Sequence, residues 1–183
     1  FPWLSSKLIE VGLAPAMAIR MNFVGELGWE LHHPIEYQNH IFDSIMAVGA
    51  EFGIKPFGIR AMDAMRLEKS YRLVGTELSI EYAALESGLH RFVHLNKGEF
   101  KGRQKLSQWQ ESGFANTMVT LEVHDTTDAD ALGGNPIRLP DGEVIGRATG
   151  GGYGFRLNKS LALAMVRPEM ATVGAELMID ILD

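Results

Sequence analysis

Hydrophobic residues recur with helical spacing in the first part of the chain. In residues 38–51, apolar side chains return every three or four positions, which predicts an amphipathic helix, and Gly53 is placed to end it. Residues 59–70 have a similar spacing, with apolar side chains on one face and charged ones on the other. The other elements expected in this part are strands at residues 15–22, 29–33 and 91–96 and a short helix at residues 101–111.

From residue 114 onward the pattern is that of β-strands. Residues 117–123 place successive side chains on opposite sides, and Pro140-Asp141-Gly142 is a strong turn signal between two further strands. The expected strands are residues 117–123, 135–139, 143–149, 161–166 and 176–182, with the glycine-rich residues 150–154 as a loop. This part of the chain therefore predicts a small all-β domain, a barrel or a sandwich.

The two patterns together predict an α+β fold in two domains. Residues 1–112 are expected to form a mixed and partial domain of helices and strands. Residues 113–183 are expected to form a small C-terminal β-barrel, truncated at its end. Because the chain starts with Phe1 and stops within a predicted strand, we expect it to be a fragment of a longer protein.

Composition and charge narrow the classes of function. The chain has 183 residues, a formal net charge of −6 and no cysteine. The acidic balance argues against a nucleic-acid binder, because neutralising phosphates requires clustered lysine and arginine. Without cysteine, disulfides, thiolate metal sites and cysteine nucleophiles are excluded. The sequence has neither an apolar run long enough for a membrane span nor a signal-peptide pattern, so we expect a cytoplasmic or organelle-matrix protein.

The segment Phe23-Val24-Gly25-Glu26-Leu27-Gly28-Trp29-Glu30 places two carboxylates beside glycines. Glycine lets the backbone come close to a flat ligand. A carboxylate accepts two adjacent N–H donors in parallel. Glu26 and Glu30 are therefore candidate ligand-binding residues. The alternative, equally open for each residue taken alone, is that both are surface residues of a hairpin.

Two arginines follow, near the start and middle of the second predicted helix. Arg60 has no acidic residue four positions later, so a partner for it could be Glu30, reached across the fold. A buried arginine needs such a partner, because an unpaired buried charge is costly. Arg66, with Asp63 and Lys69 close in sequence, is expected to be ordinary charge on the helix surface.

The histidine and glycine motifs are less specific. His32 and His33, as neighbours in a strand, point to opposite faces and cannot easily bind one ion, so no metal site is expected. His94 is expected to be a half-buried structural residue of its strand. Gly150-Gly151-Gly152-Tyr153-Gly154 lacks the ending of a phosphate loop and the following helix of a dinucleotide fingerprint. We expect a tight β connection, in which Tyr153 is either a plain loop residue or an aromatic wall of a ligand site.

Several motifs occur in the order found in one protein family. They are Phe23 to Glu30, Gly58-Ile-Arg-Ala-Met-Asp-Ala-Met-Arg-Leu-Glu-Lys69, Glu86-Ser-Gly-Leu-His-Arg-Phe-Val93, Lys97-Gly-Glu-Phe-Lys-Gly102 and Thr149-Gly-Gly-Gly-Tyr-Gly154. Over nearly its whole length the chain resembles the aminomethyltransferase (glycine cleavage T-protein) family. Arg66-Leu-Glu-Lys69, followed by Tyr71-Arg-Leu-Val-Gly75, is most similar to the folate-binding C-terminal region of dimethylglycine and sarcosine dehydrogenases.

The resemblance implies a tetrahydrofolate site within a folate-binding, aminomethyltransferase-like domain. In the family, a tyrosine at the position of Phe23 lines the pocket, the carboxylate at Glu30 binds the pterin ring, and the arginine at Arg60 belongs to the same site. Phe23 keeps the aromatic ring and lacks the hydroxyl. A pterin presents an N–H and an exocyclic amino group side by side, which suits one carboxylate. Tyr153, in the last of the shared motifs, is the further candidate for a cofactor contact.

The reaction that the resemblance implies is folate-dependent one-carbon transfer. A methylene or methyl group leaves a small methylamine-type donor and is captured by the folate. The family's essential aspartate lies in an N-terminal half that has no counterpart in this sequence, so no catalytic residue is assigned. We expect this part to be inactive alone and to work with the missing half of the same chain and, in a dehydrogenase, with a flavin domain.

Three alternatives stay open. The chain could be a folate-binding module without catalytic activity, a structural domain of a multidomain flavin oxidoreductase, or part of a sulfonium demethylase of the same superfamily. The related folate-binding proteins of iron–sulfur cluster assembly carry a cysteine in a Lys-Gly-Cys-Tyr motif. The comparable place here reads Lys97-Gly98-Glu99-Phe100, which argues against that branch.

Overall fold

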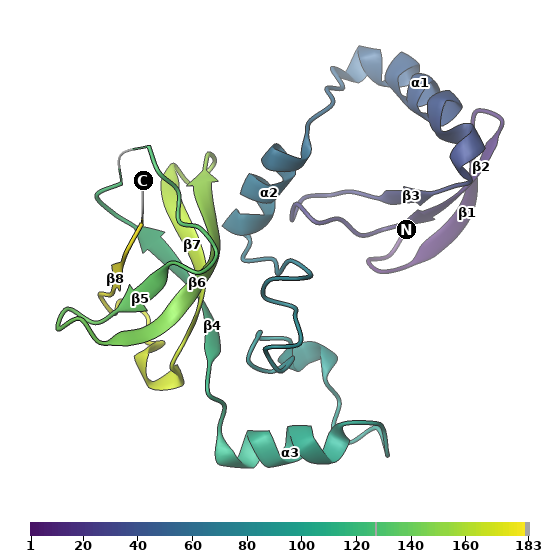
Figure 1. The fold of residues 1–183 in the computed structure, drawn as a ribbon. Coiled ribbons are helices and arrows are strands. Elements are labelled where there is room, and N and C mark those ends of the chain that lie inside the picture. The colour runs from purple at the N-terminus through teal and green to yellow at the C-terminus, as the bar shows by residue number, and fades with distance from the viewer. Residues whose placement is uncertain (127, 182–183) are drawn as a thin grey trace. The chain divides into compact units, whose positions relative to one another are not determined.

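The computed structural model describes residues 1–126 and 128–181 (Figure 1). Contacts divide the chain into two compact units, Phe1–Asp63 and Ala64–Asp183, and each unit is described by itself. This division falls earlier in the chain than the domain boundary expected between residues 112 and 113, which stays a prediction.

The first unit contains a three-stranded antiparallel sheet in the order β1-β2-β3. Its strands are β1 (Ser6–Val11), β2 (Ala14–Ile19) and β3 (Glu30–His32). Strands at residues 15–22 and 29–33 were expected from the sequence and correspond to β2 and β3, whereas β1 was not expected. Gly12 turns the chain between β1 and β2 at a φ of 61°, where glycine carries no steric penalty.

The two faces of this sheet differ in exposure. Along β2, Ala14, Ala16 and Ala18 are buried, so these alternate positions line a closed face. Met17, one position along, is 37% exposed and lies on the opposite face. The sheet therefore has one packed face and one open face, and the open face is where β3 presents Glu30.

A helix follows the sheet as the sequence predicted. A short 3₁₀ turn precedes α1 (Gln38–Gly49), a second one follows it, and Gly53 ends the segment at a φ of 68°. Ile41 is its buried residue, and α1 contacts β1. His40 accepts a hydrogen bond from the backbone N–H of Leu13 at 3.1 Å, so the hairpin turn and the helix are joined directly.

Helix α2 (Ile59–Glu68) matches the second predicted helix, and α3 (Arg103–Ser112) the third. The strand predicted at residues 91–96 is wrong, because this segment contains a 3₁₀ turn at His90–Phe92 followed by turns. His94 is exposed there and not half-buried. Alternation of polar and apolar residues alone did not make a strand, since none of the described strands pairs with this segment.

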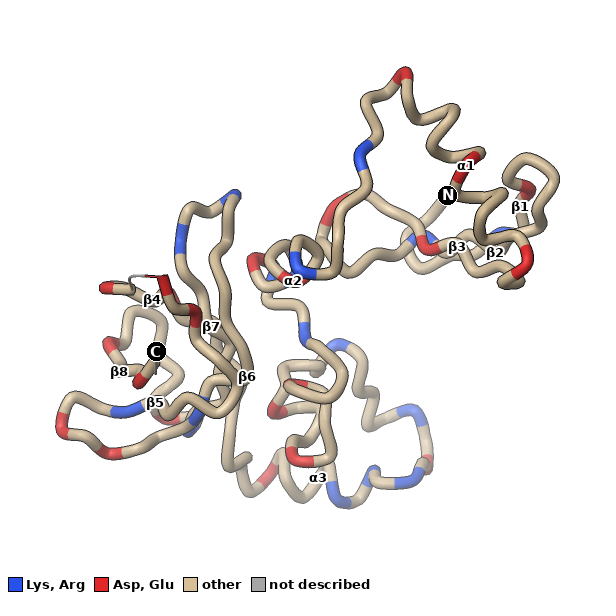
Figure 2. The backbone as a smooth tube through the Cα atoms, turned by 45° about the horizontal axis from the view of Figure 1, so that its top comes forward, with Lys and Arg blue, Asp and Glu red and all other residues tan. Residues whose placement is uncertain are grey.

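Basic residues are frequent along the chain from Arg91 into α3, where Figure 2 colours several positions of the backbone blue. Several of these cations lie over aromatic rings close in sequence, and each is about 5 Å from a ring centroid. The pairs are Arg91 with Phe92, Lys97 with Phe100 and Lys105 with Trp109. Arg103 instead pairs with Glu99 at 2.9 Å and donates to the Leu95 carbonyl. Local contacts of this kind order a segment that contributes little to the buried core.

The second unit contains a five-stranded antiparallel sheet in the order β4-β7-β6-β5-β8. Its strands are β4 (Thr117–Val123), β5 (Pro136–Arg138), β6 (Val144–Gly154), β7 (Lys159–Val166) and β8 (Met178–Ile179). The prediction of five strands is confirmed, and β4 has the expected bounds. Of the expected strand at residues 176–182, residues 178–179 form β8 within the described part, and residue 182 lies outside the described residues.

The core of this unit packs around buried apolar side chains of β5, β6 and β7. They are Ile137, Ile145, Ala148, Ala164 and Val166. Together with the first unit this confirms the α+β fold class.

Candidate functional site

The loop that leads into β3 is organised by one side chain. The Asn22 side-chain oxygen accepts hydrogen bonds from the backbone N–H groups of Val24 at 3.0 Å, Gly25 at 2.7 Å and Glu26 at 3.3 Å. Its amide nitrogen donates to the Glu26 carbonyl. Asparagine bonding to following backbone groups is a common way to hold a turn. The loop therefore has a defined shape, and sequence reasoning did not single out Asn22.

Two aromatic residues bracket this loop. Phe23 is half-buried at its start. Trp29, at its end, is 45% exposed and meets the Phe1 ring edge-on at a centroid distance of 6.1 Å. A Cβ at Gly28 would lie 3.0 Å from the Cβ of Asn22, so a larger residue there would press on the side chain that holds the loop.

Glu30 lies on the open face of the three-stranded sheet. It pairs with Ile19 of β2, and residues directly opposite each other in an antiparallel pair share a face. On the same face, Met17 of β2 lies between its two cross-strand partners, His32 of β3 and Leu8 of β1. The face therefore presents a carboxylate among apolar side chains, an arrangement that can take a flat ligand with N–H donors on its edge.

The Glu30 carboxylate is engaged by a residue that the sequence did not suggest. His32 Nε2 lies 3.2 Å from Glu30 Oε2, and the two side chains are 52% and 43% exposed. Arg60 is exposed in the first turn of α2, and among the described residues no ion pair joins it to Glu30. The pairing of Arg60 with Glu30, and the role of both in a ligand site, therefore stay predictions.

Tyr153 does not lie in a loop. The glycine-rich residues 150–154 continue β6, and the connection to β7 is made by residues 155–158, so the predicted loop is wrong. The strand needs glycine here because a Cβ at Gly151 would lie 2.7 Å from the Ala131 carbonyl oxygen. The Tyr153 hydroxyl donates to Asn158 Oδ1 at 2.6 Å, and its ring packs edge-on against Phe155. Its role in cofactor binding stays a prediction.

A buried charged network lies within the second unit. Arg66, expected on the helix surface, is only 4% exposed, and its Nη1 lies 3.8 Å from Oε2 of the fully buried Glu77. The same Nη1 donates to the Tyr71 carbonyl at 3.0 Å. Arg66 therefore pairs inward with an acid in the irregular segment after α2, and the prediction of a surface charge is corrected.

Hydrogen bonds keep Glu77 ionised. Burial by itself would raise the pKa of Glu77, but hydrogen bonds from the Thr149 hydroxyl, the Leu73 N–H and the Thr76 hydroxyl outweigh it, so the pKa lies below its ordinary value. The Leu73 and Thr76 donors are both 2.8 Å from Oε2. This carboxylate is fully engaged by the protein and has a structural role.

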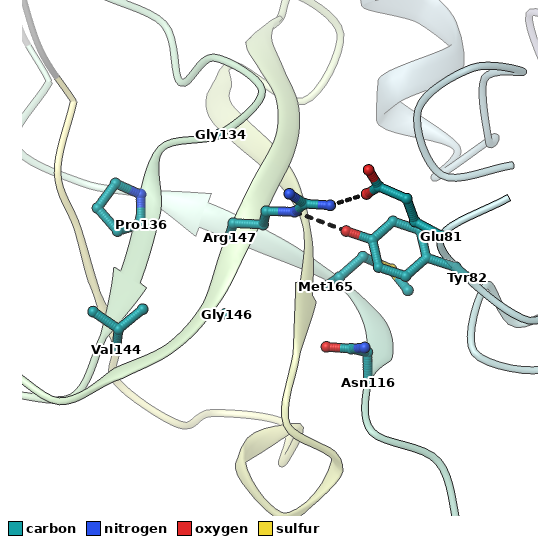
Figure 3. A pocket seen from close by; sticks show the side chains of 9 residues that line it. All are labelled: Glu81, Tyr82, Asn116, Gly134, Pro136, Val144, Gly146, Arg147 and Met165. Carbon is teal, nitrogen blue, oxygen red and sulfur yellow. Dashed lines mark hydrogen bonds and ion pairs between the residues drawn. The ribbon is translucent and has the colours of Figure 1, made fainter. Parts of the chain in front are cut away.

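The structure also has an open pocket of about 540 Å³ in the second unit (Figure 3). Arg147 projects into it from β6, where its Nε donates to the Tyr82 hydroxyl at 2.9 Å and its Nη2 pairs with Glu81. The hydrogen bond to Tyr82 and the charge of Glu81 raise the pKa of Arg147. Glu81 pairs with the guanidinium, so the one basic side chain among the described lining residues already has a carboxylate partner.

Residues 1–126 and 128–181 contain neither a cluster of metal-ligating side chains nor a membrane-spanning helix. No group of three or more histidine or carboxylate side chains is placed to hold a metal ion. None of the helices in these ranges combines the length and apolar character needed to cross a bilayer.

Comparison with known proteins gives matches along almost the whole chain. Residues 1–97 match the GCVT N-terminal domain, and residues 116–183 match the glycine cleavage T-protein C-terminal barrel domain. The predicted boundary between residues 112 and 113 falls in the interval between the two matches. Tyr153 lies within the second match, whereas Phe23, Glu30 and Arg60 lie within the first.

The curated relatives are longer proteins. Mitochondrial dimethylglycine dehydrogenase of Homo sapiens is 40% identical over all 183 residues, which cover 21% of that protein. An aminomethyltransferase of Moorella thermoacetica is 36% identical over 181 residues, 99% of this chain and 48% of the relative. The chain therefore spans about a fifth of the dehydrogenase and just under half of the aminomethyltransferase.

A solved structure shows the same fold. Aminomethyltransferase T of the glycine cleavage system from Bartonella henselae superposes with a TM-score of 0.82 over 90% of this chain and 45% of its own, at 21% sequence identity. At that identity the likeness concerns the fold. The two family matches cover the sheet that carries Glu30 and the sheet that carries Tyr153. The chain therefore belongs to the glycine cleavage T-protein family.

Proposed function

We propose that this chain forms the tetrahydrofolate-binding part of an enzyme that transfers one-carbon groups. The observation that carries the proposal is the position of Glu30, a carboxylate on the open face of a sheet where the apolar side chains of Ile19, Met17 and Leu8 lie beside it. The family membership and the names of the relatives, aminomethyltransferase and dimethylglycine dehydrogenase, support the same function.

The fit between Glu30 and a reduced pterin rests on hydrogen-bond chemistry. An ionised carboxylate has two oxygens and only accepts, whereas the pterin edge presents a ring N–H beside an amino group and only donates there. Two parallel, charge-assisted hydrogen bonds are stronger and more directional than one. Ile19 and Met17, on the same face, offer apolar surface beside the carboxylate.

Phe23, Arg60 and Tyr153 are the other residues proposed to contact the folate. The Phe23 ring stacks on the pterin, and the exposed Arg60 guanidinium meets an electron-rich part of the folate. Tyr153 belongs to the second unit and is proposed, separately, as a further folate contact. When bound, tetrahydrofolate supplies the nitrogen that accepts the one-carbon unit. The residues of this chain bind and orient it, and we assign none of them as the catalytic acid or base.

The donor is proposed to be a small methylated amine. The identity of 40% to dimethylglycine dehydrogenase over the full length of the chain favours this class of donor. It also favours a second candidate function, in which the chain is the non-catalytic folate-binding module of a flavin-dependent dehydrogenase. In both cases the chain works together with residues of a longer protein, and alone it is expected to bind folate without turnover.

The test is calorimetric titration of tetrahydrofolate into the wild-type chain and into Glu30→Ala. Loss of a charged acceptor for two donors should weaken binding by about tenfold or more, since a hydrogen bond to a charged group contributes about 1.5–3 kcal/mol. Glu36→Ala, which removes an exposed carboxylate from the same unit outside the sheet, is the matched control and should bind as the wild type does. Equal affinity of Glu30→Ala and the wild type would refute the proposal.

A further inference from the structure

We infer that His32 is a positioning residue for the ligand-binding carboxylate of Glu30. This inference rests on the proposed function, and it assigns a role to a side chain on the open face of the first unit's sheet. The structural basis is one contact: His32 Nε2 lies 3.2 Å from Glu30 Oε2.

The backbone places these two side chains together. Glu30 and His32 begin and end the short strand β3, and alternate residues of a strand project on the same face. Their cross-strand partners, Ile19 and Met17, are apolar and offer the carboxylate no hydrogen bond. Among the described residues, His32 is therefore the side chain that fixes the orientation of the Glu30 carboxylate.

The contact leaves the carboxylate able to bind a ligand. The two oxygens of an ionised carboxylate offer about four lone-pair sites, and His32 uses one of them, on Oε2. The remaining sites accept the paired N–H donors of a pterin. Because a carboxylate accepts only, the Nε2 atom of His32 must carry the proton of this hydrogen bond, which selects one tautomer of the ring.

The orientation of the Glu30 carboxylate matters because it must accept hydrogen bonds from both N–H donors of the pterin at the same time. A carboxylate free to rotate about its last bond presents two coplanar acceptors only part of the time, and ordering it on binding costs affinity. His32 holds the group before the ligand arrives. Both side chains are about half exposed, so the pair contributes little to folding stability, and its loss should appear in ligand affinity.

The experiment compares His32→Leu, which removes the donor at similar volume, with His32→Gln, which keeps an N–H donor. Tetrahydrofolate affinity, measured by calorimetry, should fall about three- to tenfold in His32→Leu, the range expected for one hydrogen bond, and be largely restored in His32→Gln. In a Glu30→Ala background His32→Leu should have no further effect, because the two residues act as a unit. His33→Leu is the matched control, since His33 bonds to the Pro34 carbonyl and not to Glu30.

A ligand-free measurement separates this inference from the proposed function. Nitrogen-15 NMR of the His32 ring should show the tautomer protonated at Nε2 in the wild type, and a mixture in Glu30→Ala. The positioning role alone would be overturned if Glu30→Ala left the tautomer of the His32 ring unchanged. It would also be overturned if His32→Leu bound as tightly as the wild type while Glu30→Ala bound weakly. A His32→Gln variant as weak as His32→Leu would do the same. Unchanged affinity in Glu30→Ala would overturn the folate site itself.

Discussion

The Thr149 hydroxyl donates a hydrogen bond to the buried carboxylate of Glu77, a contact across 72 positions of the sequence. Thr149 occupies a register shift between Ala148 and Gly150 of β6, where this strand has one residue more than β7 opposite it. Such a bulge re-aims a side chain out of the regular alternation. The bulge and Arg66 thereby hold the irregular segment that carries Glu77 against the sheet.

Replacing Glu77 with glutamine should strongly destabilise the protein. The substitution removes the carboxylate charge that faces the buried Arg66 guanidinium and weakens the hydrogen bonds that Glu77 accepts, a change that costs about 3 kcal/mol or more. Urea denaturation followed by circular dichroism measures the free energy of unfolding. Glu81→Gln is the control, because the Glu81–Arg147 pair is at least half exposed and should contribute less than about 1 kcal/mol. Equal stability of the two variants would contradict the role given to Glu77.

The Glu77 network also predicts a pH dependence. The pKa of Glu77 is lower in the folded protein than in the unfolded chain, so the ionised carboxylate stabilises the fold at pH values above the ordinary pKa of glutamate. This stabilisation is lost as the pH falls toward the folded-state pKa of Glu77. The free energy of unfolding of the wild type should therefore decrease on acidification below about pH 4.5, more steeply than that of Glu77→Gln. Parallel curves for the two proteins in urea titrations at several pH values would show that Glu77 does not titrate in this way.

Two glycines of β6 should respond differently to alanine. A Cβ at Gly146 would lie 2.2 Å from the Met165 carbonyl oxygen and 2.8 Å from the Val166 Cα, both backbone atoms that cannot rotate away. Gly146→Ala should lower the free energy of unfolding by about 1–3 kcal/mol, as overpacking does. A Cβ at Gly150 would meet only Arg66, at 3.9 Å, so Gly150→Ala should be close to neutral. The melting temperatures of the two variants test this, and a reversed order would contradict the packing described for β6.

The elements that were predicted correctly are those whose local pattern agrees with their packing. Strand β4 and helix α1 are amphipathic, and Gly53 ends its segment in the left-handed conformation that glycine favours. Residues 91–96 have the same alternation as a strand, yet they lack a pairing partner, and pairing depends on residues far along the chain. For the strands, the local pattern predicted the element type correctly only where a distant pairing partner was available.

The parts that escaped prediction depend on contacts between distant residues. The burial of Arg66 follows from Glu77, which lies in an irregular segment without periodicity, so no spacing rule connects them. Residues 150–154 were predicted as a loop because they are rich in glycine, yet they form the end of strand β6. Glycine is needed at position 151 because Ala131 lies close to the strand there. For the site, Glu30 was predicted as a ligand-binding residue from its neighbours in sequence and stays a prediction, whereas the contact with His32 became visible only in the strand geometry.

Asn22 offers a test of the loop that precedes Glu30. Asn22→Ala removes the oxygen that accepts hydrogen bonds from the N–H groups of Val24 and Gly25. The amide hydrogens of these two residues should then exchange with solvent roughly tenfold faster, because a loss of about 1.4 kcal/mol in local stability corresponds to a factor of about ten. Asn22→Asp keeps an acceptor oxygen and should stay closer to the wild type. Hydrogen exchange followed by NMR gives both rates. If Asn22→Ala leaves them unchanged, the side chain does not hold the loop.

If the Glu30 carboxylate binds the N–H edge of a reduced pterin, a comparison of two ligands on two proteins shows it most directly. Calorimetry should show that the wild type binds tetrahydrofolate about tenfold more tightly than an analogue lacking the exocyclic amino group, because the analogue loses one hydrogen bond to a charged acceptor. Glu30→Ala should bind both ligands equally. The same discrimination in Glu30→Ala as in the wild type would mean that another group reads this edge of the ligand.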